Sequence, residues 1–91
     1  MDKVYLLRGS SGEDESDYVE WTVAAYLDAD KAIEHKRRLL QALDVWWKMP
    51  MSARKETNGS TALDPVHGFS FYPSTESYWI DDVELRTEVP T

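Results

Sequence analysis

The fold is decided by residues 28–48, DADKAIEHKRRLLQALDVWWK, where the spacing of apolar residues changes from two to about 3.6. Asp28 is a predicted N-cap, and Asp30 lies in the first turn, where the helix dipole favours an acid. The helix is expected to run from Ala29 to about Lys48, because Pro50 disfavours helical geometry in the residue before it. Its apolar positions form one stripe, which makes it amphipathic: Ala29, Ala32, Ile33, Leu39, Leu40, Leu43, Trp46 and Trp47.

Three β-strands are predicted on either side of this helix, at residues 3–8, 18–27 and 78–86. The first is short and apolar, and it is expected to end at Gly9, where a loop rich in Gly and Ser begins. Both of its faces are apolar, with Val4 and Leu6 on one face and Tyr5 and Leu7 on the other. This pattern is typical of a central strand.

The last strand breaks strict alternation at residues 81–82, and a β-bulge there is predicted to return Ile80 and Val83 to the same face. Together these elements predict an α+β fold of β-β-α-β order. Its three-stranded antiparallel sheet has the order 2-1-3, and the long amphipathic helix lies on one face. This order places the strand with two apolar faces in the centre.

One helix covers only one face of such a sheet, so the other face is expected to be uncovered. We assign to it Tyr5, Leu7 and Tyr26, together with Trp79. An exposed aromatic face of this kind is an interaction surface. It is expected to be covered by residues 49–76 folding back, by a second copy of the chain or by another protein.

The 91 residues are expected to form a single domain, without internal repeats. Residues 49–76 contain several breakers of regular structure and are interpreted as an irregular insertion. Within it, Phe69–Tyr72 is predicted to form a short extra strand or a hydrophobic clasp. The tail at residues 87–91 is expected to fray.

Composition excludes several classes of protein. The chain has 17 acidic residues against 10 Lys and Arg, a net charge of −7 that disfavours binding to nucleic acid. It has no cysteine, which excludes disulfides and Cys-based zinc sites. No segment reaches the roughly 18 apolar residues of a membrane span, and the N-terminal apolar run is too short for a signal peptide. We therefore expect a cytoplasmic protein.

The loop after the first strand is strongly acidic. Its carboxylates could hold Ca²⁺ or Mg²⁺, but the spacing lacks the pattern of a calcium-binding loop. A solvated charge run is favoured, and a docking patch for a basic partner comes second. With the two tyrosines of the uncovered face, the acids make up the predicted partner-binding residues: Tyr5, Tyr26, Glu13, Asp14, Glu15 and Asp17.

The two histidines are the other candidates for chemistry. His35 lies on the helix in the basic run 35–38, and His67 follows Asp64 in a turn-like stretch. Histidine can ligate metal or act as acid and base. We interpret both as surface histidines and the basic run as an exposed helix face, so no catalytic, cofactor or metal site is predicted.

The first half of the chain and its last strand resemble known sequences. The stretches are KVYLLRG at 3–9, SDY at 16–18, VAAYLD at 23–28, YWI at 78–80 and VEL at 83–85. They resemble a group of small uncharacterised proteins of bacteriophages, prophages and bacterial genomes, relative to which residues 49–76 are an insertion. The resemblance implies a phage or bacterial origin and a β-β-α-β fold, but it transfers no activity and no functional residues.

Three functions are consistent with these patterns. The favoured one is a non-enzymatic accessory protein, phage-encoded and directed at host machinery, that binds a protein partner or a second copy of itself. The first alternative is an inhibitor that mimics nucleic acid, which requires the acids to line one face. The second is a metal-dependent enzyme or metal-binding protein that uses Asp64, His67 and the acidic loop.

Overall fold

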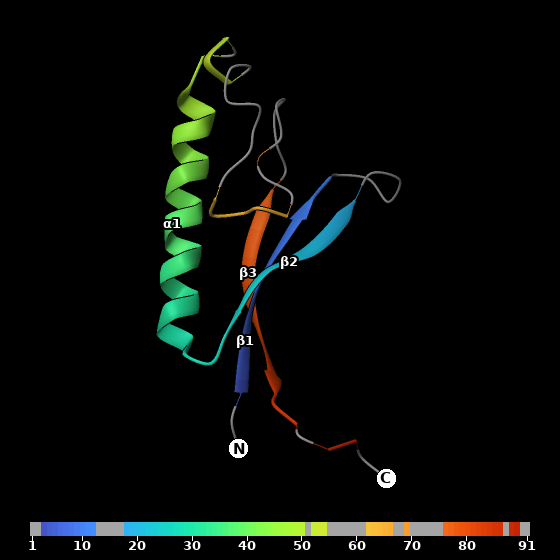
Figure 1. Ribbon diagram of the computed structural model, residues 1–91. Helices are drawn as coiled ribbons and strands as arrows, with labels where there is room; N and C mark the ends of the chain where they lie inside the picture. Colours follow the sequence, from blue (N-terminus) through green and yellow to red (C-terminus); the bar gives the residue numbers. More distant parts are fainter. Residues whose placement is uncertain are drawn as a thin grey trace.

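Figure 1 shows the computed structural model of the protein, which describes residues 3–12, 18–50, 52–54, 62–66, 69, 76–86 and 88–89. The elements follow in the order β1 (Lys3–Ser11), β2 (Val19–Tyr26), α1 (Ala29–Lys48) and β3 (Ser77–Glu84). The strands form an antiparallel sheet in the order β2-β1-β3, and α1 runs along one face of it. The predicted α+β fold is confirmed.

Helix α1 begins and ends where its sequence predicts. The Asp28 carboxylate accepts a hydrogen bond of 2.8 Å from the Asp30 amide, which satisfies one of the free N–H groups of the first turn. Met49 has extended geometry, as the residue before Pro50 must. The buried stripe is narrower than predicted, because only every seventh residue is fully covered and Ile33 and Leu40 remain exposed. The buried positions are Ala32, Leu39 and Trp46.

Strand β1 extends three residues beyond its predicted end. The backbone stays extended through Ser11, and the turn begins at Gly12, whose φ of 105° is unfavourable for any residue with a side chain. Gly9 lies inside the strand because the indole of Trp21 packs directly above its Cα. A Cβ at this position would lie 2.7 Å from Trp21 Cε2, closer than two carbons can approach.

Strand β3 pairs with β1 in continuous register, so the predicted bulge at residues 81–82 is wrong. Ile80 lies opposite Leu7 and Val83 lies opposite Val4, which places these two residues on different faces of the sheet. Asp81 and Asp82 point to opposite faces of the sheet, as successive strand residues do, and both side chains are exposed to solvent. The irregularity lies in the pairing of β1 with β2 instead, where the register shifts between Leu7 and Arg8.

The face assigned to Tyr5, Leu7 and Tyr26 is covered by α1, so the prediction that it is open is wrong. Leu7 has no exposed surface, and Tyr26 hydrogen-bonds to His35 of the helix. Because both faces of β1 are apolar, alternation alone did not distinguish them. Of the four residues assigned to the open face, only Trp79 lies there, opposite Arg8.

The core lies between the sheet and α1. Its buried members come from every element and from the segment after the helix: Leu7, Trp21, Leu39, Trp46, Phe69 and Tyr78. The rings of Trp46 and Phe69 are 6.1 Å apart, so the described part of residues 49–76 extends the core on the helix side. The rest of the predicted Phe69–Tyr72 element lies outside the described residues. In the described part of the chain, no helix is both long and apolar enough to span a bilayer.

Candidate functional sites

A cleft of about 440 Å³ opens beside the N-terminal half of α1. Three segments that are distant in sequence form its walls: the end of β2, the first turns of α1 and residues 62–63. Side chains of both charges line it, together with aromatic and aliphatic groups. The lining residues are Tyr26, Asp30, Lys31, Glu34, His35, Arg38, Ala62 and Leu63.

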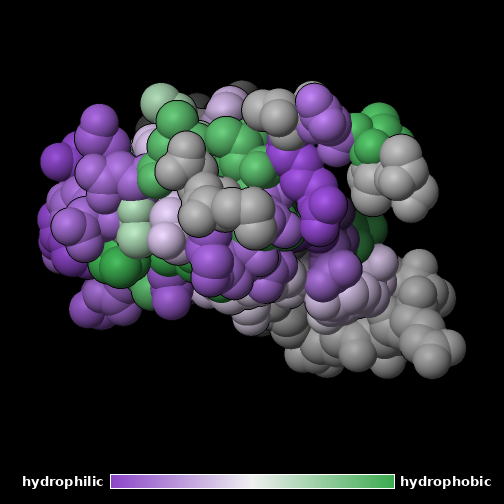
Figure 2. Space-filling model, turned by 90° about the horizontal axis from the view of Figure 1, so that it is seen from below, coloured by the Kyte–Doolittle hydropathy of each residue, from purple (hydrophilic) through white to green (hydrophobic). Residues whose placement is uncertain are grey.

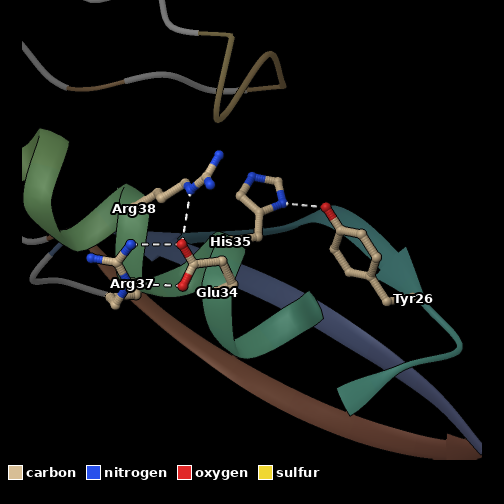
Figure 3. A network of polar contacts seen from close by, with 5 residues as sticks. All are labelled: Tyr26, Glu34, His35, Arg37 and Arg38. Carbon is tan, nitrogen blue, oxygen red and sulfur yellow. Dashed lines mark hydrogen bonds and ion pairs between the residues drawn. The ribbon is translucent and has the colours of Figure 1, made fainter. Parts of the chain in front are cut away.

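His35 joins the three walls of the cleft, because it lies on α1 and its ring bonds to Tyr26 and to Leu63. Figure 3 shows the bond to Tyr26. Its Nε2 lies 2.7 Å from the carbonyl oxygen of Leu63, which can only accept, so Nε2 carries the proton. In the neutral imidazole Nδ1 is then an acceptor, and the Tyr26 hydroxyl donates to it over 2.8 Å. Both ring nitrogens are therefore engaged, and His35, predicted as a surface histidine, is half-buried in the wall of the cleft.

Glu34, which lines the same cleft, binds two arginines, of which Arg38 lines the cleft and Arg37 does not (Figure 3). It accepts two hydrogen bonds from Arg37, of 2.6 and 2.8 Å, and one of 3.0 Å from Nε of Arg38. Bonds from Arg37 first, and then from Arg38, lower the pKa of Glu34 to about 2. The carboxylate is thus ionised at any physiological pH, and two guanidiniums beside one carboxylate leave a net positive charge.

A buried carboxylate lies next to Leu63 on the core side. Asp64 is 1% exposed, and its Oδ2 accepts hydrogen bonds from Trp21 Nε1 at 3.0 Å and from the Tyr78 hydroxyl at 2.7 Å. The predicted alternative that pairs Asp64 with His67 in a metal site is not supported by this orientation, because the carboxylate faces the core. His67 itself lies outside the described residues. Among those that are described, no cluster of three or more His, Asp or Glu could hold a metal ion.

Burial, and secondarily the bond to Asp64, raises the pKa of Tyr78 far above its ordinary value of about 10. Above pH 10 the unfolded chain releases this proton while the folded chain keeps it, so Tyr78 should make stability fall as pH rises. We expect Tyr78→Phe to be less stable than wild type at pH 8 but to lose stability less steeply between pH 10 and 11.5. Urea unfolding across this range measures both effects.

Tyr18→Phe is the matched control for the loss of a tyrosine hydroxyl, because the Tyr18 side chain is exposed. Its free energy of unfolding at pH 8 should stay within about 0.5 kcal/mol of wild type. If the free energy of unfolding falls equally with pH in Tyr78→Phe and in wild type between pH 10 and 11.5, Tyr78 ionises as readily in the folded chain as in the unfolded one.

The face of the sheet opposite α1 forms a second candidate surface, which we call the open face. It consists of Val4, Leu6, Arg8, Thr22, Ala25, Trp79, Asp81 and Val83. Val83 is 47% exposed, and the Trp79 indole lies along the face with its Nε1 donating to Asp81 over 3.1 Å. No helix or strand of the described chain lies against this face (Figure 1). Figure 2, which views the molecule from below, shows exposed hydrophobic surface amid hydrophilic surface.

The predicted partner-binding residues are only partly brought together. Tyr5 and Tyr26 are cross-strand neighbours, but they lie on the face that α1 covers. Glu13, Asp14, Glu15 and Asp17 lie outside the described residues. Four of the described acids pair with bases and so do not belong to a free acidic stripe: Asp82 with Lys3, Glu34 with Arg37 and Arg38, Asp44 with Lys48, and Glu84 with Arg86.

Sequence reasoning missed the cleft. Its residues are separated by 9 positions between Tyr26 and His35 and by 28 between His35 and Leu63. The only local signal was a tyrosine at the end of a strand followed by a histidine in the second turn of a helix. Comparison with known proteins adds nothing to this signal, since no protein-family model, curated protein or solved structure matches the chain.

Proposed function

We propose that the chain is a non-enzymatic interaction protein that binds a partner protein through the open face of its sheet. The observation that carries this proposal is the exposure of Val83, which lies opposite Val4 near the end of β3, on the same face as Leu6 and Trp79. No helix or strand of the described chain covers this face. Apolar side chains gathered on one exposed face favour a binding surface over a catalytic one. The ion pairs of the described acids give the nucleic-acid mimic less support.

The size of the open face indicates which kind of partner suits it. Three strands about 4.8 Å apart and eight residues long, at about 3.3 Å a residue, cover roughly 14 by 26 Å. Even doubled for the relief of the side chains, this footprint stays below the roughly 800 Å² that each partner buries in a standard interface. The face therefore fits a transient contact with another protein better than an obligate dimer of this chain.

Val83→Glu tests the proposal. A carboxylate on this face would be buried without a partner in the contact, so we expect it to weaken binding at least about tenfold. Affinity capture from cells that encode the chain, followed by mass spectrometry, identifies the partner. Calorimetry with the purified partner then measures the dissociation constant, and light scattering on the free protein measures its mass.

Val45→Glu is the matched control, because Val45 is a valine of similar exposure, 56%, on the outer side of α1. It adds the same charge away from the open face and should leave the affinity unchanged. If both variants stay folded and bind the partner equally well, the open face is not the contact surface. A dimeric mass that Val83→Glu converts to a monomer would assign the face to a second copy instead.

A further inference from the structure

We infer that the cleft beside α1 binds a small organic anion, a carboxylate or phosphate ester carried on an aromatic or aliphatic body. The cleft lies on the helix side of the sheet, opposite the open face, so this inference does not depend on the proposed function. It rests on the volume of the cleft, the composition of its walls and the arrangement of charge at its rim.

The volume and the walls fit a small molecule. About 440 Å³ lies within the roughly 300–1,000 Å³ that small-molecule sites span. Leu63 and Ala62 form one wall, and the ring of Tyr26 contributes to another. The methylene stems of Lys31 and Arg38 add further apolar surface while their charged ends reach the rim.

The charge at the rim favours an anion, although the chain as a whole is acidic. Two bases, Lys31 and Arg38, line the cleft together with two acids, Asp30 and Glu34. One of these two, Glu34, is already shared between two guanidiniums. Lys31 forms no salt bridge with any described residue. When Arg37, which pairs with Glu34 beside the cleft, is counted, Lys31 and Arg38 stand against Asp30 alone, an excess of one positive charge.

Arg38 is placed to receive the anionic group. Its Nε–H donates a hydrogen bond to Glu34. Its terminal nitrogens, Nη1 and Nη2, form no hydrogen bond within the described part of the chain. In Figure 3 the end of its guanidinium lies beyond Glu34, on the same side of α1 as the His35 ring. A guanidinium fixed by one carboxylate and open at its other edge is suited to a second, planar anion.

Titration with small aromatic probes, followed by amide chemical shifts of the labelled protein, tests the inference. Benzoate and phenyl phosphate represent the two anionic sources, and benzylamine and benzyl alcohol have similar bodies with a positive charge or none. We expect saturable shifts at the cleft residues with at least one of the two anions, and weaker binding of benzylamine and benzyl alcohol. The better of the two anions identifies the source.

Two arginine variants separate binding in the cleft from general attraction. Both Arg37 and Arg38 pair with Glu34, but only Arg38 lines the cleft. Arg38→Gln should weaken binding of the better anion about tenfold or more, the usual effect of losing a charge-assisted bond. Arg37→Gln, which removes the same charge one residue away, should change it less than twofold. Ala62→Trp, which fills the cleft, should abolish binding.

Three results would overturn the inference. The first is the absence of saturable shifts at the cleft with both anions. The second is benzylamine or benzyl alcohol binding as tightly as the better anion, which would show that charge does not select the ligand. The third is an equal loss of affinity for the anion in Arg37→Gln and Arg38→Gln, both folded. This would show that the affinity depends only on the net charge of the helix.

Discussion

Gly9→Ala should lower the free energy of unfolding by about 1–3 kcal/mol, the usual cost of overpacking a core. The added Cβ would lie 2.7 Å from Cε2, 2.8 Å from Cζ2 and 2.9 Å from Nε1 of Trp21. Neither partner can easily yield, because Gly9 belongs to the central strand and is flanked by Trp21 on one side and Tyr78 on the other. Urea unfolding followed by tryptophan fluorescence measures the loss.

The indole of Trp21 decides whether Gly9→Ala stabilises or destabilises the protein. Alanine restricts the unfolded chain more than glycine does, which alone would stabilise the protein by about 0.4–1 kcal/mol. The clash exceeds this gain because Trp21 Nε1 is bonded to Asp64 and the ring cannot rotate away without breaking that bond.

Ser11→Ala serves as control for Gly9→Ala. It changes a half-buried position of the same strand without adding a carbon, and its effect should stay within about 0.5 kcal/mol. If Gly9→Ala is as stable as wild type, Trp21 does not lie over this glycine.

The elements and their order could be predicted because each has a local cause. Asp28 caps the helix, Pro50 ends it, and the change of period between residues 27 and 29 separates strand from helix. The central position of β1 followed from its two apolar faces. The same two faces prevented a prediction of which one α1 covers, since Val4 and Leu6 are as apolar as Tyr5 and Leu7.

The remaining errors concern contacts between residues that are distant in sequence. Gly9 looked like the start of a loop, and only Trp21, 12 residues later, explains a glycine inside a strand. Asp64 before Pro65 has the local signature of an exposed turn, whereas its burial depends on donors from β2 and β3. His35 has charged neighbours on α1, which suggested a surface position, whereas the Leu63 carbonyl covers its ring edge.

Asp64→Ala should be at least as destabilising as Gly9→Ala, with an expected loss of about 3 kcal/mol or more. Each hydrogen bond to a charged group contributes about 1.5–3 kcal/mol, and the substitution removes the acceptor of two of them at once. Asp64→Asn keeps one carbonyl oxygen in place and should lose less. We expect urea unfolding at pH 7 to give the highest free energy of unfolding for wild type, a lower one for Asp64→Asn and the lowest for Asp64→Ala.

A double-mutant cycle distinguishes the lost bonds from a simple loss of packing. Tyr78→Phe removes one donor and leaves the ring in the core, so its effect should be smaller in the Asp64→Ala background than in wild type. The difference should be about 1 kcal/mol or more, because in that background the hydroxyl has already lost its acceptor. Additive effects of the two substitutions would show that the Tyr78 hydroxyl does not depend on Asp64.

The same substitution connects the core to the cleft. Asp64 follows Leu63 directly, and the carbonyl of Leu63 holds His35. Without the carboxylate, residues 62–66 lose their bonds to β2 and β3, so the cleft wall should open more often than in wild type. In the Asp64→Ala variant, hydrogen exchange at the backbone amides of residues 63 and 64 should therefore accelerate more than exchange in β1, where the strand pairing is unchanged. Uniform acceleration across the chain would mean instead that Asp64 stabilises the whole fold without preference for the cleft.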